Sequence, residues 1–267
     1  MCRNRRKTVR CRPLGDMSGQ APQVRPFGSA GDLDIPLSAA DRPTVVTALL
    51  SRCSDQLDSE AWWGKPVGTR IASLLQIAAA TDGVNAFPVQ LQCAIAECQS
   101  AFEIMLPLDD VIGHGGAAVA ERVTVTLPDG ERATVRPPTG NDQREWRRHR
   151  YASRDEAAVA IASRLVIEPH LSSIGSTAMD TIAAALAAAD PLVSFIVSCT
   201  CPACGQPHET TVDLEMLALR RIAAQRQALL QDVHALARAY GWTEQETLAI
   251  PPERRAEYRE LIDRVAG

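Results

Sequence analysis

The chain has few aromatic residues and no long apolar run. Phe, Trp and Tyr make up 4% of its 267 residues, so alanine and leucine must supply most of the core. Such a composition favours helices. No run approaches the roughly 20 apolar residues of a membrane span, and no apolar signal core follows the basic N-terminus. We therefore expect a cytoplasmic protein without membrane contacts.

Recognisable catalytic motifs are also lacking. The sequence has no Ser/His/Asp or Cys/His arrangement of the kind that builds a nucleophile, and no phosphate-binding loop. The formal net charge is −4, although six of the first twelve residues are Arg or Lys. The rest of the chain is therefore acidic, which disfavours nucleic-acid binding. These absences favour a non-enzymatic function.

Eight cysteines are the most informative residues that are present. Residues 194–211 begin with an apolar, β-branched run, continue through Cys201-Pro-Ala-Cys204-Gly and end in two threonines. This order predicts a two-stranded β-hairpin whose turn presents two thiols. The hairpin offers half of a zinc site, because zinc in structural sites takes four protein ligands.

A second stretch follows the same plan earlier in the chain. Residues 89–103 contain an apolar strand, the pair Cys93 and Cys98, and a strand of alternating character. Alignment of Cys98 with Cys204 also superimposes acidic positions, namely Glu103 on Glu209 and Asp109 on Glu215. We interpret the two stretches as a degenerate internal repeat.

Two such hairpins facing each other can close one tetrahedral metal site. Cysteines of a cytoplasmic protein more often bind metal than form disulfides, so we predict a structural zinc ion bound by Cys93, Cys98, Cys201 and Cys204. Cys199 aligns with Cys93 better than Cys201 does, so Cys199 is an alternative ligand, and His208 is another. The competing interpretation is two ordinary hairpins with thiols packed as small apolar groups.

The remaining pattern predicts a mainly helical α+β fold with two zinc-knuckle-like hairpins, one further β-hairpin and long C-terminal helices. We divide the chain into five segments: a disordered basic and Pro/Gly-rich arm (1–40), helices with the first cysteine hairpin (41–112), a Gly-rich loop with a β-hairpin and a basic helix (113–152), helices with the second cysteine hairpin (153–213), and a long helix with a helical cap (214–267).

Two tryptophans precede a turn. Trp62 and Trp63 lie before Gly64-Lys65-Pro66, and if exposed they would anchor a partner. The alternative is that they cover the adjacent helix.

Several short motifs occur in a recognisable order from about Ala61 to the C-terminus. They are Pro66-Val-Gly68-Thr-Arg70, Leu108-Asp-Asp110, Arg136-Pro-Pro-Thr-Gly140, Asp190-Pro191 before the second cysteine pair, and His234-Ala-Leu-Ala-Arg-Ala-Tyr240-Gly-Trp242. In these motifs the chain resembles the T4-type phage baseplate protein family, which assists baseplate hub assembly in contractile tails and contractile injection systems. The spacing of Cys93 and Cys98, the extra Cys199 and the N-terminal arm depart from that family.

The resemblance implies a non-enzymatic assembly factor or minor baseplate component that binds hub or spike proteins. It would act in the cytoplasm of the producing bacterial cell or remain associated with the particle. We expect Trp62, Trp63, Tyr240 and Trp242 to contact the partner. The alternative function is a zinc-ribbon protein that binds nucleic acid through the arginines of residues 3–12 and 144–150, which would make its binding salt-sensitive.

Overall fold

The computed structural model describes residues 23–38, 41–55, 57–116, 119–169 and 175–266. These residues confirm the expected α+β fold. The helices are η1 (Ala30–Asp32), α1 (Arg42–Arg52), α2 (Ser59–Trp63), α3 (Val67–Asp82), α4 (Leu108–Gly116), α5 (Gly140–Arg148), α6 (Arg154–Leu165), α7 (Ser176–Ala189), α8 (Leu214–Tyr240), α9 (Glu244–Ala249) and α10 (Pro252–Ala266). The strands are β1 (Ala86–Gln92), β2 (Ala101–Pro107), β3 (Val123–Thr126), β4 (Arg132–Val135), β5 (Val166–Glu168), β6 (Ile196–Thr200) and β7 (Pro207–Thr211).

Helices α3 and α8 pack along each other at the centre of the molecule, and α1 and α4 also pack on α3. The carboxylate of Asp213 accepts a hydrogen bond from the Met216 N–H at the start of α8. Gly241 ends this helix with a φ of 73°, in the left-handed region that favours glycine. The predicted long C-terminal helix is therefore confirmed, and none of the described helices is long and apolar enough to cross a membrane.

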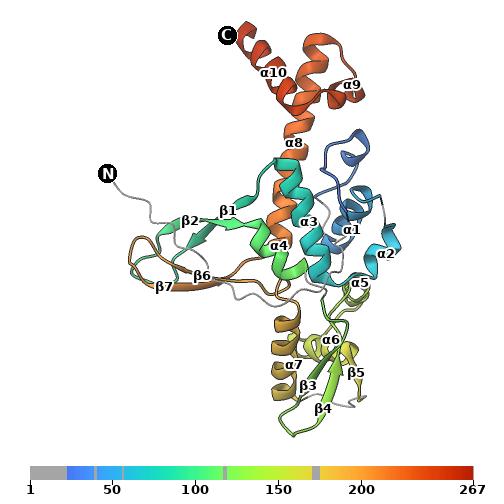
Figure 1. The fold of residues 1–267 in the computed structure, drawn as a ribbon, viewed down its shortest axis with the longest axis vertical. Coiled ribbons are helices and arrows are strands. Elements are labelled where there is room, and N and C mark those ends of the chain that lie inside the picture. Colours follow the sequence, from blue (N-terminus) through green and yellow to red (C-terminus); the bar gives the residue numbers. More distant parts are fainter. Residues whose placement is uncertain (1–22, 39–40, 56, 117–118, 170–174, 267) are drawn as a thin grey trace.

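The three sheets formed by the described residues are small and antiparallel. Strands β1 and β2 form one hairpin, β6 and β7 form another, and β3, β4 and β5 form a three-stranded sheet in that order. Figure 1 shows the two cysteine hairpins projecting together from one side of the α3 and α8 pair. The ends of both hairpins thus lie away from the main helical core.

A second, smaller core lies in the segment between the two cysteine hairpins. Val125, Ala133, Val135 and Val166 of the three-stranded sheet pack there with Ile182 of α7. The predicted hairpin around Asp129-Gly130 is confirmed by the pairing of β3 with β4. Strand β5 was not predicted, because its three residues follow α6 directly and pair only with β4.

The prediction of a disordered arm is wrong for residues 23–38. Phe27, Leu33 and Ile35 are buried in the main core. The carboxylate of Asp32 accepts hydrogen bonds from the guanidinium of Arg25 and from the backbone N–H of Gly28, which fixes the local turn. Three dispersed apolar side chains therefore order a segment whose composition resembles a linker, while residues 1–22 lie outside the described part.

The Gly-rich loop expected from residue 113 is also corrected, because Gly113 to Gly116 continue helix α4. Val111 of this helix is buried in the main core. Asp109 and Asp110 lie in the first turn of α4, where negative charge is favourable to the helix dipole. Packing and charge at the start of the helix thus outweigh the low helix propensity of glycine at its end.

Candidate metal centre

Each cysteine hairpin has two thiols in its turn. Cys93 directly follows β1, and its backbone N–H donates to the Ser100 carbonyl across the turn. Cys201 directly follows β6, and its N–H donates to the Gln206 carbonyl in the same way. Gly205 has a φ of 72°, which explains the Cys-Gly sequence at this tight turn.

The four predicted ligands come together. The sulfur atoms of Cys93, Cys98, Cys201 and Cys204 all lie within 4.8 Å of one another. The Sγ atoms of Cys93 and Cys204 are 3.7 Å apart, and those of Cys98 and Cys201 are 3.8 Å apart. A tetrahedral zinc ion with Zn–S bonds of about 2.3 Å requires S···S separations of about 3.8 Å. A disulfide would instead need about 2.05 Å.

The thiols of Cys93 and Cys201 differ in acidity. The backbone N–H groups of Cys204 and Ala203 point at the sulfur of Cys201 and lower its pKa to about 7 despite burial. The N–H of Ile95 favours the thiolate of Cys93, but burial and the neighbouring thiols outweigh it and raise the pKa of Cys93 to about 12. Because the thiolate is the form that binds metal, a metal ion at this site would displace protons.

Cys199 and His208 lie outside this four-sulfur group among the described residues. They face each other across β6 and β7, one residue pair before the turn. The His208 ring contacts Phe102 edge-on, with ring centroids 6.1 Å apart. Cys199 therefore does not correspond to Cys93 in the structure. Cys201 takes the position of Cys93, and the first turn has more residues between its two cysteines than the second turn has.

The structure supports the internal repeat beyond the cysteines. Gln90 lies opposite Glu103 in the first hairpin, and its side-chain amide donates to the carboxylate at 2.6 Å. Ser198 lies opposite Glu209 in the second hairpin, and its hydroxyl donates at 3.1 Å. The two glutamates thus accept equivalent cross-strand hydrogen bonds. In each repeat unit a helix precedes the hairpin and another follows it, as α3 and α4 do in the first and α7 and α8 in the second.

The expected partner-binding role of Trp62 and Trp63 does not fit their burial. Trp62 has no exposed surface, and Trp63 is 5% exposed. The guanidinium carbons of Arg70 and Arg144 each lie 5.0 Å from the centroid of the Trp63 ring. The pair therefore covers the adjacent helices, because cations and core side chains occupy its surfaces.

Tyr240 and Trp242, the other two predicted contact residues, lie together at the end of α8. Their rings stack with centroids 4.8 Å apart, and Tyr258 of α10 meets both edge-on at 5.7 and 5.0 Å. Tyr240 is 41% exposed. Tyr258 was not among the predicted contact residues, because only the packing of α10 on α8 brings it into this aromatic cluster.

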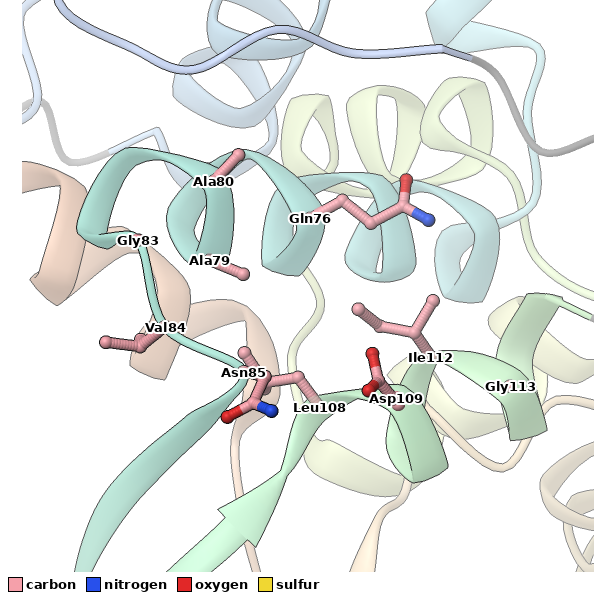
Figure 2. A pocket seen from close by; sticks show the side chains of 10 residues that line it. All are labelled: Gln76, Ala79, Ala80, Gly83, Val84, Asn85, Leu108, Asp109, Ile112 and Gly113. Carbon is pink, nitrogen blue, oxygen red and sulfur yellow. The ribbon is translucent and has the colours of Figure 1, made fainter.

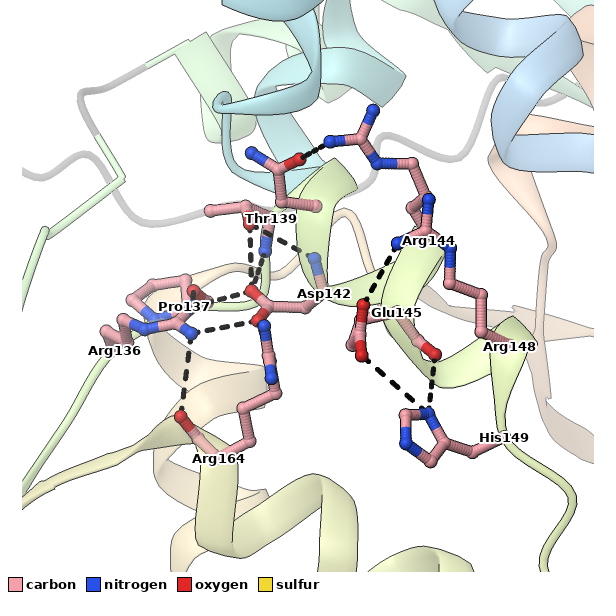
Figure 3. Close-up of polar contacts among 10 residues, drawn as sticks. Arg136, Pro137, Thr139, Asp142, Arg144, Glu145, Arg148, His149 and Arg164 are labelled. Atoms are coloured by element: carbon pink, nitrogen blue, oxygen red, sulfur yellow. Dashed lines mark hydrogen bonds and ion pairs between the residues drawn. The ribbon is translucent and has the colours of Figure 1, made fainter.

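Most arginines of α5 and its surroundings pair with acidic groups, and Figure 3 shows those that pair with Asp142 and Glu145. Both Arg136 and Arg164 pair with the buried carboxylate of Asp142, at 2.6 and 2.9 Å. Arg144 pairs with Glu60, and Arg147 pairs with Asp41. These ion pairs reduce the positive charge that the basic segment offers to a nucleic acid.

Comparisons with known proteins give no match: no family model, no curated protein and no solved structure is similar to this chain. The function is therefore inferred from the geometry of the chain and from its sequence motifs.

Proposed function

We propose that this chain is a non-enzymatic assembly protein whose two hairpins are joined by a structural zinc ion, and that it binds hub or spike subunits of a phage baseplate or contractile injection system. The observation behind the zinc assignment is the four-sulfur group, whose members come from two hairpins far apart in the sequence. Four thiolates complete the coordination shell of zinc and leave no position for a catalytic water.

A metal ion at this position would stabilise the tips of the two hairpins. A two-stranded hairpin is marginally stable alone, and the tips of these hairpins share only a small buried cluster of Cys93, Phe102 and Cys201. A zinc ion would join the two tips and hold the repeat units in a fixed relation. Helices α4 and α8 leave these hairpins, so the ion would also fix the surfaces that they present.

The identity of the partner rests on the motifs shared with the baseplate family. The aromatic cluster of Tyr240, Trp242 and Tyr258 supports a protein partner, because partly exposed tyrosine and tryptophan are enriched among residues that dominate binding energy. The zinc-ribbon alternative has less support, since Arg144 and Arg147 are paired with carboxylates.

The proposal is tested by affinity purification of the tagged protein from bacteria that assemble the particle. Mass spectrometry of the eluate and of purified particles is expected to find hub or spike subunits with the tagged protein. Hub or spike subunits in the eluate, with the tagged protein missing from the particles, would identify a transient assembly factor. If the tagged protein is also found in the particles, it is a permanent component. Nucleic acid in place of these subunits would overturn the proposal in favour of the zinc-ribbon alternative. Elemental analysis of the same eluate is expected to find one zinc per chain.

A further inference from the structure

An apolar groove of about 990 Å³ separates part of α3 from α4 on the surface of the first repeat unit. The groove is lined by the apolar residues Ala79, Val84, Leu108 and Ile112, and Ala80 lies on its α3 side (Figure 2). Val84 is 41% exposed although it is a large apolar residue. Small side chains on α3 leave room beside the larger ones on α4, so the groove can accept side chains of another element.

Three polar side chains accompany this apolar surface. Gln76, Asn85 and Asp109 line the groove, and their side chains make no hydrogen bond or ion pair with any other described residue. Asp109 is exposed in the first turn of α4. An apolar groove with a few unengaged polar groups is the usual form of a specific binding site.

The internal repeat shows how the equivalent acidic position is covered in the second unit. The alignment of Cys98 with Cys204 superimposes Leu108-Asp109 on Leu214-Glu215, and both leucines are 1% exposed at the start of the helix after the hairpin. Glu215, unlike Asp109, is buried. Its carboxylate pairs with the Nε of Arg42 at 2.9 Å.

Helix α1 provides this cover in the second unit. Arg42 is its first residue, and it also pairs with Asp213 at 2.8 Å. The buried residues that follow, Val45, Val46, Leu49 and Leu50, lie three, four, seven and eight positions after Arg42. The same helix packs on α3. The first residue of an amphipathic helix therefore pairs with the acidic groups at the start of α8, whereas no described residue forms an ion pair with Asp109 at the start of α4.

We propose that the groove between α3 and α4 binds an amphipathic helix of a partner protein that has an Arg or Lys near its first turn and apolar residues on the following face. The basic side chain pairs with Asp109, as Arg42 pairs with Glu215. The apolar side chains contact Ile112, Val84 and Ala79. The partner is a hub or spike subunit, and in that respect the inference rests on the proposed function.

Photo-crosslinking in the producing cell tests this inference. Ala80 is replaced by p-benzoylphenylalanine in the full chain, and Val159, an exposed apolar residue of α6, is replaced in the control. The expected product is a crosslink from position 80 to a hub or spike segment with an Arg or Lys followed by helically spaced apolar residues. The Val159 control is expected to give no crosslink to that segment.

Charge reversal provides the second measurement. Asp109→Lys is expected to reduce co-purification of the partner at least about fivefold, because it replaces an attraction with a repulsion. Reversal of the crosslinked Arg or Lys to Glu in the partner is expected to restore it. Asp180→Lys, at an exposed position of α7, is the matched control and should leave co-purification unchanged.

The outcomes separate the two proposals. If hub or spike subunits co-purify equally with Asp109→Lys and with the wild-type protein, and no crosslink forms at position 80, the groove assignment is wrong and the proposed function is supported. If those subunits never co-purify but position 80 crosslinks to a segment of the expected chemistry in an Asp109-dependent way, the groove assignment stands and the proposed function falls. A crosslink to a second copy of the chain or to residues 1–22 overturns the assignment of a partner helix.

Discussion

The backbone N–H of Gly68 donates a hydrogen bond to Oδ2 of Asp190 at 2.9 Å, although the two residues are 122 positions apart. Gly68 lies in the first turn of α3, and Asp190 directly follows α7. Asp190 is buried, and this burial raises its pKa although the Gly68 N–H favours the carboxylate. The bond joins the helices that precede the two cysteine hairpins.

Gly68→Ala is expected to destabilise the protein by about 3 kcal/mol, in the upper range of overpacking in a core. A Cβ at this position would overlap Oδ1 of Asp190, and the surrounding structure is buried. Urea unfolding followed by circular dichroism measures the change. Removal of the carboxylate in Asp190→Ala relieves the overlap, so the double variant should lose less stability than the sum of the two single variants.

Gly113→Ala is the control for this experiment. A Cβ there meets no atom within 4 Å, and the residue is helical, so the substitution should stabilise the protein by up to about 1 kcal/mol. Equal stability of Gly68→Ala and the wild-type protein would contradict the close packing of α3 against Asp190.

The hairpins and the long helix could be predicted from the sequence because their signals are local. Cys201-Pro-Ala-Cys204-Gly contains both the ligand spacing and the turn residues, and Asp213 and Gly241 mark the two ends of α8. The convergence of the four cysteines followed from the similarity of two local patterns. It required no knowledge of the helices between them.

Long-range contacts explain what the sequence could not show. The burial of Trp63 depends on Arg70 and Arg144, which belong to two other helices. Phe27 enters the core from a segment with linker-like composition. The choice of Cys201 over Cys199 depends on a turn length that differs between the repeat units, which a gapless alignment does not reveal.

Asp142 is expected to make stability depend on acid pH. Hydrogen bonds from Arg136, Thr139 and Arg164 outweigh the effect of burial and hold the pKa of its carboxyl well below the usual value. A carboxylate with a lowered pKa stabilises the fold above its unfolded-state pKa of about 3.9, and this contribution is lost as pH falls through the folded-state value. Asp142→Asn should cost about 2 kcal/mol at pH 7.

The measurement is urea unfolding of the wild-type protein and of Asp142→Asn between pH 7 and pH 3. The difference between them should begin to shrink as pH falls towards the unfolded-state pKa of about 3.9, because the carboxyl then binds a proton in the unfolded chain while the folded carboxylate stays charged. A difference that stays constant over this range would show that the charge of Asp142 does not stabilise the fold. Asp129→Asn, in the exposed turn between β3 and β4, serves as the control.

Arg70→Met is expected to destabilise the protein by about 3 kcal/mol, because it removes three buried hydrogen bonds that a charged group donates. The Arg70 guanidinium donates to the carbonyls of Trp62 and Pro43 and to the Thr47 hydroxyl, at 2.8 to 3.0 Å. Burial lowers its pKa to about 10, so it remains charged at pH 7. Thermal unfolding measures the loss, and Arg148→Met on the surface should change stability by less than about 0.5 kcal/mol.

Cys204→Ser is expected to remove zinc and lower the melting temperature together, because three thiolates bind zinc less tightly than four and zinc binding contributes to folding. Cys199→Ser is the matched control in the same hairpin, since Cys199 lies outside the four-sulfur group. It should retain one zinc per chain. Elemental analysis and thermal unfolding, with and without a chelator, measure both quantities. If chelation removed zinc without lowering the melting temperature, the ion would not join the hairpins; if Cys199→Ser lost zinc and Cys204→Ser kept it, the ligand assignment would be wrong.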